Sequence, residues 1–186
     1  MITKPFSPRD IFAQPVVNSS RVFLSPQRYI QGPGVIKNCG LYLSLINAKH
    51  VGVLASKRGF SAEAANVLQS LSEAGIEYSK AEFRGECSKE EVERHTNDLM
   101  SAKPDCILAV GGGKLVDAGK CIAYRLNCQV GIIPTLASND APCSSISVLY
   151  TVDGVKDVVE YFPQNPAFVI VDTEVIVNAV SYTHLT

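Results

Sequence analysis

The sequence predicts an α/β fold, a Rossmann-like parallel sheet flanked by helices. Short apolar runs alternate with amphipathic stretches from Arg21 onward, a pattern typical of βαβ units. One apolar run, residues 106–110, leads directly into three glycines and then into a helix-like stretch. The chain of 186 residues, 46% hydrophobic and 19% charged, has the composition of one folded domain with tails.

Five strands and four helices account for this alternation. The expected strands are residues 51–54, 77–83, 106–110, 131–133 and 168–171. The expected helices are residues 34–48, 61–74, 89–102 and 114–126. Ser61 has the position of an N-cap, and Gly75 follows the same stretch where a left-handed residue ends a helix. Ser88 and Glu91 have the spacing of a capping box.

The rest of the composition describes an ordinary cytoplasmic protein. Residues 1–20 are proline-rich without periodicity, and we expect them to form an extended arm. The six cysteines include no CxxC pair and no secretory signal precedes them, so we interpret them as reduced, mostly buried thiols. No apolar stretch reaches the roughly 20 residues of a membrane span. A net charge of -1 gives no basic field for nucleic acid or an anionic membrane.

The glycine run is the most informative feature. In DCILAVGGGKLVDAGK, a buried-type strand meets Gly111, Gly112 and Gly113 at the start of a helix. Glycines leave room for a phosphate to approach, and a helix N-terminus offers free N–H groups and a positive dipole end. We therefore expect a phosphate site, although a tight turn without a ligand is the alternative reading.

Two familiar phosphate motifs do not fit this run. A P-loop is excluded because Leu108 occupies its first glycine position and Leu115 follows the lysine. The GxGxxG dinucleotide fingerprint fails because its third glycine falls at Val116. Asp117, one turn into the helix, is either a first-turn acid favoured by the dipole or a residue that fixes a neighbouring loop.

A second polar segment, residues 134–151, follows the fourth strand and ends in the strand-like SVLYT. It reads PTLASNDAPCSSISVLYT and is dense in hydroxyl side chains. Ligands of open α/β sheets collect at the carboxyl ends of the strands, so this segment is a candidate part of the same site. On composition alone it is equally compatible with a polar surface loop.

Taken together, the GGGK…D helix, this second segment and the later VDTEVIVNA resemble the glycerol dehydrogenases of the iron-containing alcohol dehydrogenase and dehydroquinate synthase superfamily. The likeness runs from about Ile30 to Ala179 and covers roughly the first half of such an enzyme. It implies the N-terminal dinucleotide-binding domain, residues 21–179, of a two-domain enzyme. That enzyme oxidises glycerol or a related small polyol to the hydroxyketone with NAD(P), and we expect it to be a homo-oligomer at full length.

The resemblance also implies individual site residues. It places the dinucleotide phosphates on the glycine loop and the lysine after it, and other cofactor contacts on the second segment. The positions are Gly112, Gly113, Lys114, Thr135 and Ser138, with Ser144, Ile146 and Tyr150 nearer the nicotinamide. Asp140 corresponds to the aspartate that binds the polyol, a task suited to a carboxylate that accepts from two hydroxyls.

The sequence departs from the family pattern after its first predicted strand. Family members usually have an acid there that accepts from the adenosine ribose, whereas this chain has Ser56 followed by Lys57 and Arg58. Because a carboxylate selects NAD and cations accept a 2′-phosphate, these residues favour NADP. The alternative is that both cations are simply solvated and that the cofactor is NAD.

The chain also lacks the metal-binding half that the resemblance implies. In the family, a divalent metal, usually zinc, is bound by an aspartate and two histidines beyond the position of Ala179. Residues 180–186 instead read VSYTHLT, which we interpret as a foreign or truncated tail. We expect His50 at a strand edge and His95 on a helix surface, and we assign neither a metal ligand nor a catalytic residue.

Three alternatives remain at this point. Dehydroquinate synthase shares the glycine loop, but its second segment should differ from ASNDAPCSS. A glycerol-1-phosphate or hydroxycarboxylate dehydrogenase would keep the cofactor chemistry and change the substrate. The chain is otherwise a non-catalytic, truncated nucleotide-binding module. Under each of these readings, we expect this chain to be inactive by itself.

Overall fold

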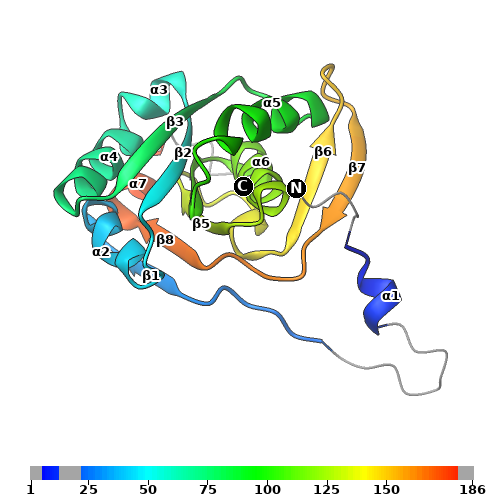
Figure 1. Ribbon diagram of the computed structural model, residues 1–186, viewed down its shortest axis with the longest axis horizontal. Coiled ribbons are helices and arrows are strands. Elements are labelled where there is room, and N and C mark those ends of the chain that lie inside the picture. Colours follow the sequence, from blue (N-terminus) through cyan, green and yellow to red (C-terminus); the bar gives the residue numbers. More distant parts are fainter. Residues whose placement is uncertain (1–5, 13–21, 180–186) are drawn as a thin grey trace.

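A six-stranded parallel sheet forms the centre of the computed structural model, which describes residues 6–12 and 22–179 (Figure 1). Its strand order is β1-β8-β5-β4-β2-β3. The strands are β1 Tyr29–Gly32, β2 His50–Ser56, β3 Glu77–Phe83, β4 Cys106–Gly111, β5 Gln129–Pro134 and β8 Phe168–Asp172. The predicted α/β class and Rossmann-like sheet are confirmed, and all five predicted strands are present.

Helices cover both faces of this sheet. They are α2 Cys39–Ser44, α3 Lys57–Phe60, α4 Glu63–Glu73, α5 Lys89–Met100, α6 Gly113–Leu126 and α7 Thr173–Asn178. One apolar core joins α2 and α4 to Val53 and Leu108, and the other joins α5 and α6 to Leu54 and Ile107. Successive strand residues thus point into opposite cores, which explains why the strands are almost continuously apolar.

An antiparallel hairpin lies apart from the main sheet, next to α6 (Figure 1). Its strands are β6 Ile146–Tyr150 and β7 Lys156–Tyr161, and Phe6 bridges to Tyr161 at its outer edge. The hairpin comes from the end of the second polar segment. Its position fixes where that segment lies relative to the glycine loop.

Several local predictions were wrong. Ser61 ends the short helix α3 instead of capping α4, whose N-cap is Ala62. The helix expected over residues 34–48 is split into a 3₁₀ turn, Val35–Asn38, and α2. In the expected extended arm, the described part contains a short helix, α1 Pro8–Phe12. The strands β1 and β7 and the helices α3 and α7 were not predicted.

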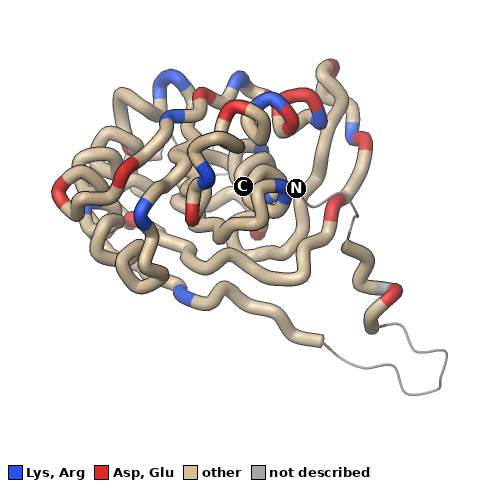
Figure 2. The backbone as a smooth tube through the Cα atoms, in the orientation of Figure 1, with Lys and Arg blue, Asp and Glu red and all other residues tan. Residues whose placement is uncertain are grey.

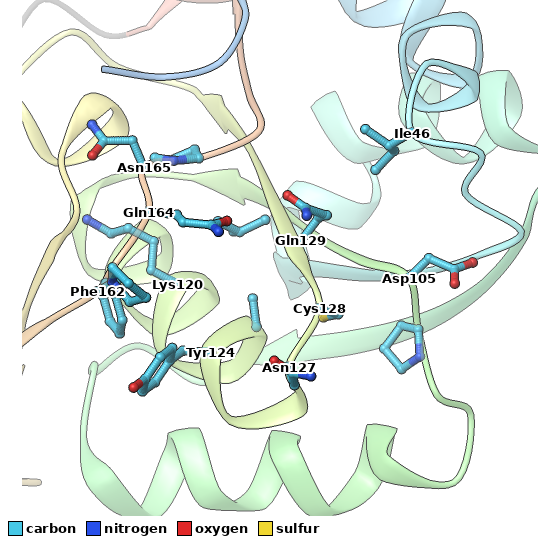
Figure 3. A pocket seen from close by; sticks show the side chains of 15 residues that line it. Ile46, Asp105, Lys120, Tyr124, Asn127, Cys128, Gln129, Phe162, Gln164 and Asn165 are labelled. Atoms are coloured by element: carbon cyan, nitrogen blue, oxygen red, sulfur yellow. The ribbon is translucent and has the colours of Figure 1, made fainter. Parts of the chain in front are cut away.

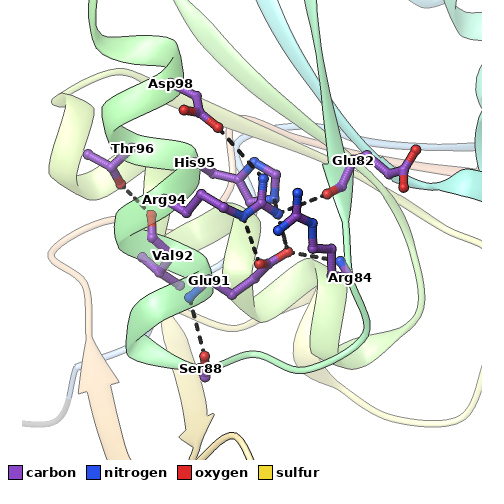
Figure 4. A network of polar contacts seen from close by, with 9 residues as sticks. All are labelled: Glu82, Arg84, Ser88, Glu91, Val92, Arg94, His95, Thr96 and Asp98. Atoms are coloured by element: carbon purple, nitrogen blue, oxygen red, sulfur yellow. Dashed lines mark hydrogen bonds and ion pairs between the residues drawn. The ribbon is translucent and has the colours of Figure 1, made fainter.

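His95 is the clearest correction. We expected a helix-surface residue, but only 1% of it is exposed, and its Nε2 lies 3.1 Å from Glu91 Oε1 (Figure 4). Burial and the neighbouring Arg94 lower the pKa of His95. Ser88 caps α5 as predicted by accepting from the Glu91 N–H, but the Glu91 carboxylate accepts from the Arg84 N–H instead of closing the box.

A buried carboxylate joins the two ends of the described fold. Asp172, at the end of β8, accepts hydrogen bonds from the N–H groups of Gly34, Ile36 and Glu174 at 3.0 to 3.1 Å. Gly34 has a φ of +69°, a left-handed conformation in which glycine is unstrained. Asp172 therefore holds the turn after β1 against the start of α7.

Replacing Asp172 with alanine should lower the free energy of unfolding by about 3 kcal/mol, because three N–H donors lose their charged acceptor. Urea unfolding followed by circular dichroism measures this loss. The exposed neighbour Glu174 gives the control, Glu174→Ala, which should cost under about 0.5 kcal/mol. Equal losses for the two variants would contradict the assignment.

Candidate functional site

A groove of about 370 Å³ opens where β2 and β4 end. These strands pair in parallel up to Ala55 and Val110, so Ser56 and Gly111 emerge side by side at the same edge. From this point the chain order runs outward in both directions, through β3 on one side and through β5 and β8 on the other. Such a switch point is where ligands of open α/β sheets bind.

The glycine loop forms one wall of the groove. Gly112 is the N-cap of α6, and no side chain among the described residues caps this helix. A Cβ on Gly111 would lie 2.8 Å from Leu115 Cδ1, and one on Gly113 would lie 2.7 Å from Asn139 Nδ2. A side chain at Gly111 or Gly113 would therefore displace Leu115 or Asn139, whereas the glycines leave the first N–H groups of a 14-residue helix free to bind an anion.

Lys114 extends from this loop to neighbouring elements. Its Nζ lies 2.7 Å from Glu86 Oε2 and 5.6 Å from the centre of the Tyr150 ring. The hydrogen bond to Glu86 raises the pKa of Lys114, so the ammonium stays protonated. The predicted phosphate-binding cation is thus at the groove, but it already has a carboxylate partner.

The other wall carries both a cation and an acid. Ser56 Oγ accepts from the Gly59 N–H at 3.0 Å and caps α3, which places Arg58 in the lining of the groove. Glu63, in the first turn of α4, lines the same wall. Glu63 was not predicted as a site residue, because the helix dipole alone favours an acid in the first turn of a helix.

The predicted cofactor-binding residues and the predicted substrate-binding residue, Asp140, fall into two groups. Six of them line the groove together: Ser56, Gly111, Gly112, Gly113, Lys114 and Thr135. The Thr135 N–H donates to the Gly111 carbonyl at 3.1 Å, which joins the second segment to the glycine loop. The others, Ser138, Asp140, Ser144, Ile146 and Tyr150, lie along the following loop and β6, outside the groove lining.

A buried ion pair on α6 holds this loop in place. Lys120 is 3% exposed, and its Nζ lies 2.9 Å from Asp117 Oδ1 and 2.9 Å from the Ala141 carbonyl. It also donates to Ser144 Oγ and to the Ile146 carbonyl. Asp117 Oδ2 accepts from the Val148 N–H at 3.1 Å. Asp117 is therefore a residue that fixes a neighbouring segment, one of its two predicted roles, and Lys120 was missed.

A second cavity lies at the opposite edge of the sheet, near the amino ends of β4 and β5 (Figure 3). It encloses about 500 Å³ and is lined by the amides of Asn127, Gln129, Gln164 and Asn165. None of the predicted site residues lines it. The larger cavity is therefore separate from the glycine loop.

The described residues contain no group of three His, Cys, Asp or Glu side chains placed to hold a metal ion. The donor set present does not fit the metal that the resemblance implies, so we assign that metal no step. In the same described ranges, no helix is long and apolar enough to cross a membrane. Lys and Arg are interspersed with Asp and Glu along the fold (Figure 2).

The parallel sheet with an open helix N-terminus at its switch point defines a Rossmann-like α/β domain. The chain belongs to the iron-containing alcohol dehydrogenase family, whose model matches residues 26–173. This range agrees closely with the one indicated by the sequence motifs.

The similar proteins include several glycerol dehydrogenases. The one from Escherichia coli O6:H1 is 39% identical over 159 residues, which are 86% of this chain and 43% of that protein. The crystal structure of a probable glycerol dehydrogenase from Sinorhizobium meliloti 1021 has a TM-score of 0.79 at 34% identity, over 86% of this chain and 43% of the other. The glycerol dehydrogenase structure from Schizosaccharomyces pombe has a TM-score of 0.78 at 37% identity, over 86% and 40%. This chain thus spans less than half the length of these relatives.

Replacing Lys120 with methionine should destabilise the chain by about 3 to 5 kcal/mol, because the Asp117 carboxylate and two carbonyls lose a buried cation. Denaturant unfolding measures the loss, and limited proteolysis should show faster cleavage within residues 138–146. Lys156→Met, at an exposed position of β7, is the matched control. Unchanged stability and cleavage in Lys120→Met would refute the anchoring role.

Proposed function

We propose that the groove at the ends of β2 and β4 binds a nicotinamide dinucleotide. One observation carries this proposal: the uncapped N-terminus of α6 follows a glycine loop that leaves its first N–H groups open to the groove. A diphosphate suits such a cradle because free N–H groups and the helix dipole both favour negative charge. The position of the groove at the switch point supports the same ligand.

Different residues are proposed to contact different parts of the cofactor. The N–H groups at Gly112 and Gly113, with the Lys114 ammonium, would hold the diphosphate. Thr135 and Ser138 would contact the cofactor along its length, and Ser144, Ile146 and Tyr150 would lie towards the nicotinamide. When bound, the nicotinamide supplies hydride-transfer chemistry. The contribution of this chain is to bind the cofactor and to orient its ring.

For the whole protein, we propose oxidation of glycerol or a related small polyol. Support comes from the relatives named glycerol dehydrogenase, which match this chain at 34% to 39% identity. Asp140, exposed in the loop before β6, is the proposed acceptor for polyol hydroxyls. This chain covers 40% to 43% of these relatives, so the activity is proposed for the whole protein and not for this chain alone.

Both NAD and NADP are compatible with the adenosine end of the groove. Arg58 lines it and is the proposed partner of a 2′-phosphate, which supports NADP binding. Glu63 lines it as well, and its carboxylate would accept from a ribose hydroxyl but repel a 2′-phosphate. We therefore propose that the two side chains set the balance between the cofactors.

The first test is calorimetric titration of the purified chain with NADH. Gly112→Val should abolish binding, because the branched side chain would occupy the space in which a phosphate meets the start of α6. Ala65→Val, on the exposed side of α4, is the control and should leave binding unchanged. A folded chain that does not bind NADH, or a Gly112→Val variant that binds normally, would count against the proposed groove.

The balance between cofactors is tested by titrating NADH and NADPH into two variants of opposite charge change. Arg58→Gln should weaken NADPH binding about tenfold with little effect on NADH, since a charge-assisted hydrogen bond to phosphate is lost. Glu63→Gln should change the ratio of the two affinities in the opposite direction, towards NADPH. Ratios that stay the same in both variants would show that neither residue reads the 2′ position.

A further inference from the structure

The ion pair between Lys114 and Glu86 joins the first turn of α6 to the loop after β3 at the edge of the groove. Lys114 lies in the groove lining, whereas Glu86 belongs to the loop after β3. The side chain of Lys114 is 55% exposed and that of Glu86 is 20% exposed. Glu86 lies outside both the glycine run and the second polar segment, and it is not among the residues proposed to hold the dinucleotide.

The loop that carries Glu86 is firmly held. The second carboxylate oxygen of Glu86 accepts from the Cys87 N–H at 3.1 Å. Before it, the Arg84 N–H donates to the Glu91 carboxylate at 2.8 Å, in the network of Figure 4. After it, the Cys87 carbonyl accepts from the Tyr150 N–H at 2.8 Å. The carboxylate is therefore a fixed charge, and the long lysine side chain is the movable partner.

A dinucleotide diphosphate would need the same ammonium. Lysine serves phosphate as a point charge and not as a directional fork, so its value to the ligand lies in its charge. A carboxylate 2.7 Å away neutralises most of that charge. The lysine side chain is 55% exposed, so solvent weakens the pair enough for a doubly charged diphosphate to replace Glu86.

We infer that Glu86 is an affinity-determining residue. It forms an ion pair with Lys114 when no dinucleotide is bound, and this pair breaks when a dinucleotide diphosphate binds to the ammonium. This inference rests on the proposed dinucleotide function. It predicts that removing the negative charge of Glu86 makes binding tighter. A merely structural role for Glu86 predicts weaker binding or none.

The experiment titrates NADH into the natural chain and into Glu86→Gln, which keeps the shape of the side chain and an oxygen that can accept from Cys87. Binding should tighten between about twofold and fivefold, the range expected for a surface ion pair. The gain should disappear near 1 M salt, where the Debye length falls to about 3 Å. Glu77→Gln is the matched control, because it changes the charge equally at the opposite end of β3.

A second pair of variants shows whether the gain acts through the lysine. In a Lys114→Gln background, Glu86→Gln should change NADH affinity no more than the Glu77 control does. Binding that weakens in Glu86→Gln, or a gain that persists without Lys114 or at high salt, would overturn the inference.

Inorganic pyrophosphate separates this inference from the proposed function. If the natural chain binds pyrophosphate but not NADH, the dinucleotide proposal fails while the pair can still be tested. Tighter pyrophosphate binding by Glu86→Gln would then support the role of Glu86, and unchanged binding would overturn it. A folded chain and a folded variant that bind neither probe would overturn both.

Discussion

The buried pair between Asp117 and Lys120 is the interaction on which the two parts of the candidate site depend. Both residues lie on α6, whose first turn carries the glycine loop. Both also bind the second segment: Lys120 donates to the Ala141 carbonyl, and Asp117 accepts from the Val148 N–H. One helix thus presents the phosphate cradle at its start and positions the loop that leads to Tyr150 from its second turn. Burying two charges is costly, and the pairing and hydrogen bonds offset that cost.

The register of the sheet does the rest of the positioning. Ala55 pairs with Val110, and Gly111 pairs with Pro134, so three strands end at one level. Their following loops supply Ser56, the glycines and Thr135 to a single groove. Because parallel strands need crossover helices, these residues are far apart in sequence yet converge without any local signal that joins them. The order and register of the strands therefore bring these residues together, and each strand contributes only the few residues at its carboxyl end.

The parts that could be predicted from sequence are those encoded locally. The strand before Gly111 is a continuous apolar run, and the glycines mark a sharp turn into a helix, so both were visible in order. The strand β1, by contrast, reads YIQG and alternates between exposed and half-buried residues because it lies at a sheet edge, so it has no apolar run that would mark it as a strand. Ser61 satisfied the N-cap pattern, but α3 had already used the preceding turn and Ser61 became its end.

The burial of polar residues is what the sequence predicted least well, and the reason is physical. His95 has polar neighbours in sequence and Lys120 has apolar ones, and the burial of both depends on what packs against their helices. Glu86 and Glu63 similarly acquire their places only when β2, β3 and β4 align. The glycine loop could be predicted because its role depends on local backbone conformation. The roles of these four side chains could not, because they depend on tertiary neighbours.

The charges around the groove suggest how it distinguishes its ligand. Lys114 is paired with Glu86, and Arg58 shares its wall with Glu63, so each cation has an acid nearby. A groove so nearly balanced has a weak net field for attracting simple anions. Selectivity then falls to the N–H groups at the start of α6, which are fixed in direction and cannot be neutralised by a neighbouring carboxylate. Such a site favours a ligand that fits the cradle and also reaches both walls, and the proposed dinucleotide is long enough to do both, whereas a free phosphate is not.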